Sequence, residues 1–84
     1  MRVALIFVLS ASILGCTKAP QDQAVSLEQV PPLLTKLAGE KLPGVKFEQA
    51  IKRGDGTYEI RGRDKRGKVR DIDLTADGQI IEIE

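Results

Sequence analysis

The chain contains no histidine and no tryptophan, and its aromatic side chains are limited to one tyrosine and two phenylalanines. Without histidine, no imidazole can act as a general base or bind a metal ion. Phe47 and Tyr58 are the only aromatic residues after residue 15, and two rings favour core packing over the stacking platform of a nucleic-acid-binding protein. These absences favour a binding or structural role over catalysis.

Net charge and chain length further limit the functions that the protein can have. The chain has 13 basic and 12 acidic residues, and Arg2 is the only charged residue among the first 15. The remainder is therefore balanced, with no excess positive charge to draw it to nucleic acid. Residues 26–84 suffice for one small domain, because a domain of about 60 residues buries only roughly 60% of its unfolded surface. Such a domain has little room for a deep ligand pocket.

The N-terminal segment has the pattern of an export signal. Residues 3–15 form an apolar run that follows the positive charge of Arg2 and ends at the only cysteine, Cys16. The run is shorter than the roughly 20 residues that cross a bilayer, but it fits the about 7–15 apolar residues of a secretory signal. We therefore expect the protein to be exported.

The residues Ile13-Leu14-Gly15-Cys16 resemble the lipobox of bacterial lipoproteins, although Leu14 departs from the alanine, serine, threonine or valine usual at its position. The resemblance implies that residues 1–15 are removed and that the Cys16 thiol is lipidated, with fatty acids such as palmitate completing the anchor. Lipidation would leave no free thiol for nucleophilic catalysis or metal binding. The alternatives are an ordinary signal cut nearby and an incidental buried cysteine.

The residues after the cysteine indicate where the protein is held. Two or three acyl chains anchor a protein stably, whereas one binds a membrane only marginally. Residues 16–25 are polar, include a proline and predict a flexible tether. Thr17, in place of an aspartate, resembles the sequences that permit transport to an outer membrane. We expect a protein lipid-anchored to the cell membrane, and to the outer membrane, facing the periplasm, in a diderm organism.

One helix is predicted between two proline-containing segments. Val30-Pro31-Pro32 favours a helix start, because proline in the first turn sacrifices no needed N–H group, and Pro43-Gly44 ends the helix. Ser26, the only serine after residue 15, is interpreted as a cap and not as a nucleophile. The apolar residues between the prolines recur at helical spacing and form one stripe: Leu33, Leu34, Leu37, Ala38 and Leu42.

Four strands are predicted after the helix, within residues 45–52, 57–61, 69–75 and 79–83, separated by glycine-containing turns. The fold class is therefore α+β, with one helix packed on a four-stranded antiparallel meander sheet. Val69 and Ile80 are out of phase with their neighbours, and either a bulge or a later strand start would reconcile them. We expect the helix to cover one apolar sheet face, formed by Val45, Phe47, Ile51, Tyr58, Ile60, Ile72, Leu74, Ile81 and Ile83.

Four segments, VPPLL (30–34), LPGVK (42–46), GTYEI (56–60) and TADGQIIEI (75–83), together resemble a PepSY domain. The resemblance extends over about residues 27–84. PepSY domains occur in the propeptides of thermolysin-type secreted metalloproteases and in cell-envelope proteins, and the family has been proposed to restrain peptidases. The resemblance implies a non-enzymatic, membrane-anchored binding module of the bacterial cell envelope that modulates or inhibits a peptidase. It supplies no catalytic residues, no cofactor and no metal site.

The physical route that we expect for partner binding is strand addition at an exposed sheet edge, which requires no special side chains. This chain carries no attached protease, so the partner is expected to be a separate envelope protein. The sequence leaves the oligomeric state open.

A basic second hairpin supplies the alternative function, an electrostatic adaptor that binds anionic lipid or cell-wall polymer. The competing interpretation, which we favour, is a solvated face on which Arg61 or Arg63 forms cross-strand ion pairs with Asp71 or Asp73. The same two carboxylates share a strand face and resemble a calcium site or an acid–base pair, but arginine pairing is the simpler explanation. The candidate anion contacts are Arg61, Arg63, Lys65, Arg66, Lys68 and Arg70.

Overall fold

A computed structural model describes residues 21–84, so the expectations for residues 1–15 and for Cys16 lie outside the described residues. The described chain forms five strands, one short 3-10 helix and one α-helix. In chain order these are β1 (Gln23–Val25), η2 (Leu27–Gln29), α1 (Pro32–Lys41), β2 (Lys46–Lys52), β3 (Tyr58–Arg63), β4 (Val69–Leu74) and β5 (Ile80–Ile83).

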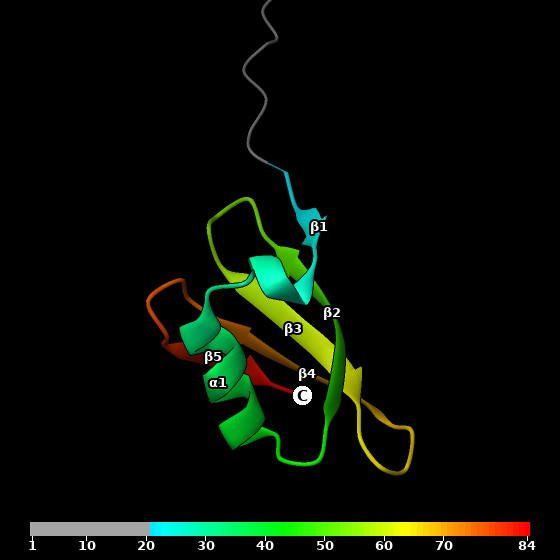
Figure 1. Cartoon of the computed structure of the whole chain (residues 1–84). Helices are drawn as coiled ribbons and strands as arrows, with labels where there is room; N and C mark the ends of the chain where they lie inside the picture. The colour runs from blue at the N-terminus through cyan, green and yellow to red at the C-terminus, as the bar shows by residue number, and fades with distance from the viewer. Residues whose placement is uncertain (1–20) are drawn as a thin grey trace, which may run out of the picture.

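The α+β class is confirmed, but the expected number of strands was wrong by one. All five strands form a single antiparallel sheet in the order β1-β2-β3-β4-β5 (Figure 1). The additional strand, β1, lies in the segment that we expected to be a tether, and it pairs with β2 through Val25 opposite Ala50. Within the described residues, β1 and β5 are the two edges of the sheet.

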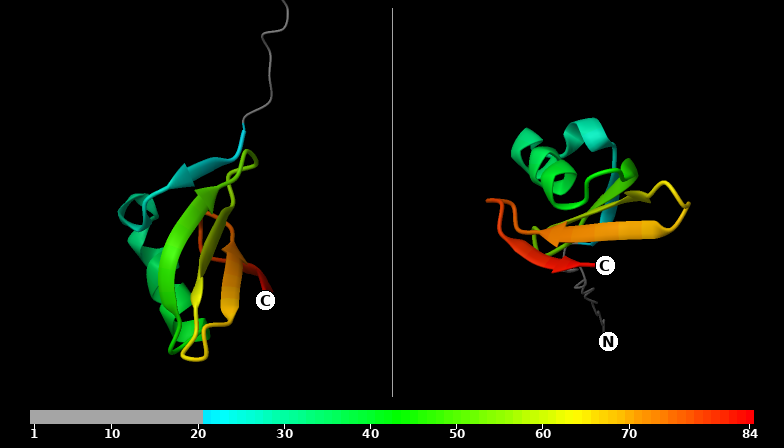
Figure 2. Two further views of the ribbon diagram at one scale, coloured as in Figure 1. Left: turned by 90° about the vertical axis from the view of Figure 1, so that its right-hand side faces the viewer. Right: turned by 90° about the horizontal axis from the view of Figure 1, so that it is seen from below.

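The helices lie on one side of the sheet, and the described residues place no element on the other (Figure 2). The twist of the sheet carries β5 away from the helical layer, as both views in Figure 2 show. No helix among residues 21–84 is long and apolar enough to cross a membrane. The domain thus has a covered face and an open face.

Local sequence explains where the α-helix begins and ends. Pro32 occupies its first position, where the missing N–H group leaves no bond unmade, and the helix ends at Lys41, just before Pro43-Gly44. Ser26 precedes η2, and the Oε1 atom of Gln29 accepts a hydrogen bond of 2.9 Å from the Ser26 main-chain N–H. The expected capping role of Ser26 therefore applies to the short 3-10 helix before α1.

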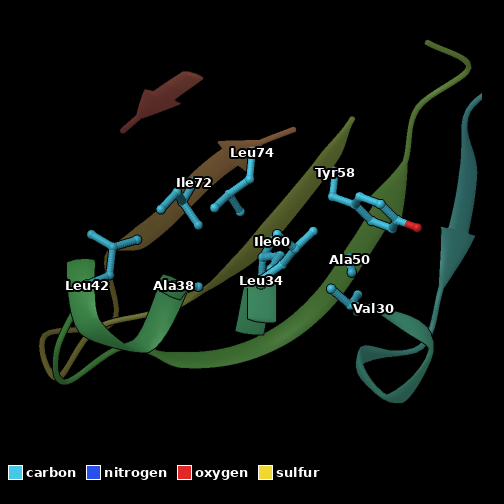
Figure 3. Packing of buried hydrophobic residues seen from close by; sticks show 9 residues of the cluster. All are labelled: Val30, Leu34, Ala38, Leu42, Ala50, Tyr58, Ile60, Ile72 and Leu74. Carbon is cyan, nitrogen blue, oxygen red and sulfur yellow. The ribbon is translucent and has the colours of Figure 1, made fainter. Parts of the chain in front are cut away.

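The core fills the space between α1 and the sheet (Figure 3). Leu34, Ile60, Ile72 and Leu74 are its largest fully enclosed side chains. From the helical side, Leu34 points at the strands, and from the sheet the isoleucines and Leu74 point back at the helix (Figure 3). The smaller or less enclosed members of the cluster are Val30, Ala38, Leu42, Ala50 and Tyr58.

One expected core residue, Ile51, was placed on the wrong face. The register of β2 shifts between Phe47 and Gln49, so an extra residue enters the strand and reverses the alternation that follows. Ala50 is therefore buried, opposite Ile60, whereas Ile51 is half-buried and lies opposite Glu59. The bulge turns the bulkier side chain of the pair to the open face.

The expectation that the helix covers Ile81 and Ile83 was also wrong, because 54% of Ile81 and 40% of Ile83 are exposed. A register shift next to Leu74 places an extra residue in β5. This bulge explains why Ile80 lies opposite the buried Leu74 although the sequence pattern puts it out of step with its neighbours. The helix reaches the preceding turn instead, where a Cβ on Gly78 would lie 3.1 Å from Leu33 Cδ2.

Candidate binding surfaces

The structure divides the six basic residues that we expected to form one anion-binding group. Arg61 belongs to the open sheet face, where it pairs with Glu59. Arg63 is near Glu48, at 3.7 Å, and donates a hydrogen bond of 3.2 Å to the main-chain oxygen of Gly67. The other four, Lys65, Arg66, Lys68 and Arg70, surround the turn between β3 and β4.

That turn is ordered by Asp64. Its Oδ1 atom accepts hydrogen bonds of 2.9 Å from the main-chain N–H groups of Arg66 and Lys68. These bonds, the one from Lys68 first, lower the pKa of Asp64. Gly67 has a φ of 82°, which few other residues adopt, and it completes the reversal.

Beside this turn is a shallow hollow of about 410 Å³, lined by Pro43, Gly44, Val45, Asp64, Lys65, Arg66 and Arg70. Three cations in its wall give it a positive potential, and Asp64 reduces that potential. The Arg70 Nε atom is already used, since it donates to the main-chain oxygen of Glu84 at 3.0 Å. The hollow can therefore offer an anion Lys65 and Arg66 without breaking an observed hydrogen bond.

The open face carries carboxylates from three adjacent strands and from the residue that follows β5. We call this group the acidic face: Glu59, Asp71, Asp73, Glu82 and Glu84. They lie in two rows across the sheet. Glu59, Asp73 and Glu82 are cross-strand neighbours in one row. In the other row, Arg61 is opposite Asp71, and Asp71 exchanges two main-chain hydrogen bonds with Glu84.

Glu59 is the centre of the ion pairs on this face. Only 7% of the residue is exposed although no helix covers it, because its two carboxylate oxygens bind different arginines, Arg53 and Arg61. Arginine side chains commonly cover neighbouring surface with their apolar stems, which accounts for the low exposure of the Glu59 carboxylate between them. Burial acts to lower the pKa of Arg53, but Asp73 and Glu59 together keep that pKa above its usual value.

The two aspartates singled out in the sequence, Asp71 and Asp73, are each paired with an arginine. Asp73 Oδ2 is 3.4 Å from Arg53 Nη1, and Asp71 Oδ2 is 3.9 Å from Arg61 Nε. Of the expected cross-strand pairs, the one between Arg61 and Asp71 is thus confirmed, whereas Arg63 lies opposite Val69. Burial raises the pKa of Asp71, and the charges of Glu59 and Glu84 add to the effect. Residues 21–84 contain no group of acids arranged to hold a metal ion.

Sequence reasoning missed Arg53 and Glu59, which organise the acidic face. They are six positions apart and belong to different sides of a turn, so only the register of β2 on β3 brings them together. The available signal was the alternation of Glu59 with the buried Tyr58 and Ile60, which places the carboxylate on the open face.

Ionic compensation decreases toward β5. Within residues 21–84, no lysine or arginine nitrogen lies within 4.0 Å of the side-chain carboxylate of Glu82 or Glu84, although Arg70 Nε donates a hydrogen bond to the main-chain oxygen of Glu84. The pKa of Glu84 is raised, first by a hydrogen bond to Glu82 and then by the charge of Glu82. The side-chain carboxylates of Glu82 and Glu84 at the sheet edge thus form no ion pair with the part of the chain that the structure describes.

The other side of β5 is apolar and exposed. Ile80, Ile81 and Ile83 are 36%, 54% and 40% exposed, and Leu33 on the neighbouring helix is 49% exposed. By contrast, β1 has only three residues and presents Gln23 and Ala24. Of the two edge strands, β5 therefore exposes the larger apolar side chains.

Comparisons of the chain with protein-family models, characterised proteins and solved structures give no match.

Proposed function

We propose that this chain is a membrane-anchored, non-enzymatic binding module of the bacterial cell envelope, similar in kind to a PepSY domain, and that it restrains a peptidase. The partner adds a strand to the β5 edge. The observation that carries the proposal is this edge, where three exposed isoleucines lie along a strand whose outer side pairs with no other strand of residues 21–84. An exposed apolar edge strand can pair with a strand of another protein, and monomeric proteins normally avoid such an edge.

The non-enzymatic part of the proposal rests on the chemistry of the carboxylates. An acid–base pair requires one carboxyl that holds a proton near neutral pH in a sheltered cleft. Glu59 and Asp73 instead bind the permanently charged Arg53, and Asp71 lies near Arg61 on an open face. The sequence contains no histidine to replace them.

The anchor is tested separately from the fold. Cys16→Ser removes the thiol that would carry the lipid, so we expect an uncut or soluble product in place of a detergent-phase lipoprotein. Mass spectrometry of the purified mature chain supplies the second measurement. An unmodified Cys16 in that protein would reject the anchor, and it would leave the binding proposal to be judged on its own test.

Binding is tested with a photo-crosslinking residue at Ile81 in the full-length chain in its native membrane. We expect crosslinks to an envelope peptidase, and addition of the full chain should lower the activity of that purified peptidase. A crosslinker at Lys36, which is exposed on α1, is the matched control. Equal crosslinking from both positions, or a captured protein without peptidase activity, would contradict the proposal.

The hollow beside the β3–β4 turn supports a second candidate, an electrostatic adaptor for anionic lipid or cell-wall polymer. Near an anionic leaflet each basic residue contributes about 1 kcal/mol, and added salt weakens this attraction. Neutralising Lys65 and Arg66 should then abolish binding to anionic vesicles. If the same change also abolished capture of the envelope protein, the adaptor would replace the strand-addition module.

A further inference from the structure

The main chain of β5 is arranged to accept one more strand. Glu84 and Asp71 exchange two hydrogen bonds of 2.9 Å, so the main-chain groups of Glu84 point toward β4. In an antiparallel ladder this direction alternates along the strand. The N–H and C=O groups of Ile83 consequently point away from β4, toward the free edge, where the described residues offer them no strand.

The side chains at this edge differ between the two faces of the sheet. On the helix side, Ile80 and Ile83 are opposite the buried Leu74 and Ile72, and each is more than one-third exposed. An added strand with apolar residues at the corresponding positions would extend the core over them.

On the open face, the same edge favours an added strand with positively charged side chains. Each row of the acidic face ends at the β5 edge in a side-chain carboxylate that forms no ion pair within residues 21–84, Glu82 in one row and Glu84, the residue after β5, in the other. A sixth strand would place its own side chains next in those rows. Basic residues there would meet two uncompensated carboxylates, whereas acidic residues would be repelled.

From this arrangement we propose that β5 selects its partner strand by pattern, taking one that alternates apolar residues on the helix side with lysine or arginine on the acidic face. The inference rests on the proposed function, since it specifies the chemistry of the strand that adds at that edge. The β5 edge would then discriminate between strands by their charge pattern as well as by their apolar residues.

A second copy of the chain does not satisfy this rule. Two β5 strands that pair about a two-fold axis and continue the sheet keep their acidic faces on the same side. Glu82 and Glu84 of one copy would then face the same carboxylates of the other, and like charges directly opposite are destabilising. The acidic edge thus disfavours self-association while leaving the apolar side available to a partner.

The rule is tested with synthetic peptides and the full-length chain in detergent micelles. One peptide alternates lysine with isoleucine over six residues, a second has the same composition with the lysines in one block, and a third has glutamate in place of lysine. We expect the alternating lysine peptide to bind and to slow hydrogen exchange at the Ile83 amide. The block peptide should bind at least about fivefold more weakly, and the glutamate peptide should not bind.

Charge reversal supplies the matched test. The double variant Glu82→Lys and Glu84→Lys should weaken binding of the alternating lysine peptide by about tenfold and allow the alternating glutamate peptide to bind. Glu40→Lys, an equivalent change at an exposed site on α1, should leave both affinities unchanged. Glu40, Glu82 and Glu84 are all exposed, so the double variant and the control variant are both expected to fold.

Several outcomes would overturn the rule. Equal binding of the alternating and block lysine peptides would show attraction by charge alone, and equal binding of the lysine and glutamate peptides would show an edge that ignores charge. Concentration-dependent dimers that protect the Ile83 amide would make a second copy the occupant.

The recognition rule and the proposed function can fail separately. If the lysine peptide binds as stated but no envelope peptidase crosslinks at Ile81, the recognition rule holds and the proposed function fails.

Discussion

The two faces of the sheet enclose adjacent residues by opposite means. Ile60 is fully buried and Glu59 is only 7% exposed, although they are neighbours on β3 and point in opposite directions. A helix and apolar contacts enclose Ile60, whereas two arginines enclose Glu59. Burial on the covered face thus depends on close packing, and burial on the open face depends on charge pairing.

This difference has a consequence for stability. Removing an apolar side chain from the covered face leaves a cavity that the surroundings fill only in part. On the open face, water can approach the arginines, so it partly replaces any ion pair that is lost. We therefore expect the covered face to be much more sensitive to substitution than the open face.

The largest effect is expected for Leu34→Ala. Leu34 is fully buried between α1 and the sheet, so the truncation should lower the free energy of unfolding by about 2–5 kcal/mol, measured by urea denaturation. Leu33→Ala is the control, because Leu33 is 49% exposed and should cost much less. Similar losses at the two positions would show that α1 does not pack on the sheet through the face that carries Leu34.

A pair of glycine substitutions tests how closely the chain packs on the covered face. A Cβ at Gly62 would lie 2.1 Å from the main-chain oxygen of Lys46, so Gly62→Ala forces the backbone of β2 to move. We expect a loss of about 1–3 kcal/mol in thermal or urea unfolding. Gly39→Ala should instead stabilise by up to about 1 kcal/mol, because it lies in α1 with nothing within 4 Å of a new Cβ. Effects of the same sign would contradict this packing.

The sequence predicted the covered face best where local chemistry decides the structure. Proline and glycine bound the helix, and the 3.6-residue period identified Leu34 and Ala38 as buried, although Leu33, which it placed in the same stripe, is 49% exposed. The bulge in β2 could not be predicted, because it depends on pairing with β3 and exchanges the faces of Ala50 and Ile51. The strand β1 was missed since its three residues carry no alternating pattern, and only the edge of β2 orders them.

The open face was predicted in part. Alternation placed Asp71 and Asp73 together, and opposite charges on neighbouring strands suggested the pairing of Arg61 with Asp71 that the structure shows. Grouping Arg61 with the basic turn residues was misleading, because its guanidinium group binds Glu59. Charge counts along a sequence do not reveal which cations remain free, since register decides which of them are paired.

The central ion pairs of the open face are tested by Glu59→Gln. The change removes the negative charge between Arg53 and Arg61, whose side chains are 29% and 41% exposed. After allowing for solvent screening, we expect a loss of about 1 kcal/mol in the free energy of unfolding. The control is Glu48→Gln, because the pair of Glu48 with Arg63 is 3.7 Å long and more exposed, and its loss should be barely measurable. A loss at Glu59 as large as that at Leu34 would remove the distinction between the faces.

The smallest effects are expected for two aspartates whose pKa values shift in opposite directions. Burial, followed by the charges of Glu59 and Glu84, raises the pKa of Asp71, so its ionised form is disfavoured in the folded protein. The stabilisation associated with a raised carboxyl pKa is complete below the ordinary value of about 3.9 and is lost as the pH rises through the folded-state value. Asp71→Asn should therefore stabilise the protein at pH 7, and this gain should vanish near pH 3.

Asp64→Asn supplies the opposite case in the β3–β4 turn. Main-chain hydrogen bonds from Lys68 and Arg66 lower the pKa of Asp64, so its contribution to stability is present above the ordinary pKa and is lost as the pH falls through the folded-state value. The substitution keeps an acceptor oxygen but removes the charge. It should therefore lower the free energy of unfolding at pH 7, and this loss should shrink as the pH falls through the folded-state pKa of Asp64. Urea denaturation of both variants at pH 7 and pH 3 measures the two signs. If Asp71→Asn also destabilises at pH 7, the ion pair of Asp71 with Arg61 outweighs the repulsion within the acidic face, and the β5 edge is less negative than the proposed partner requires.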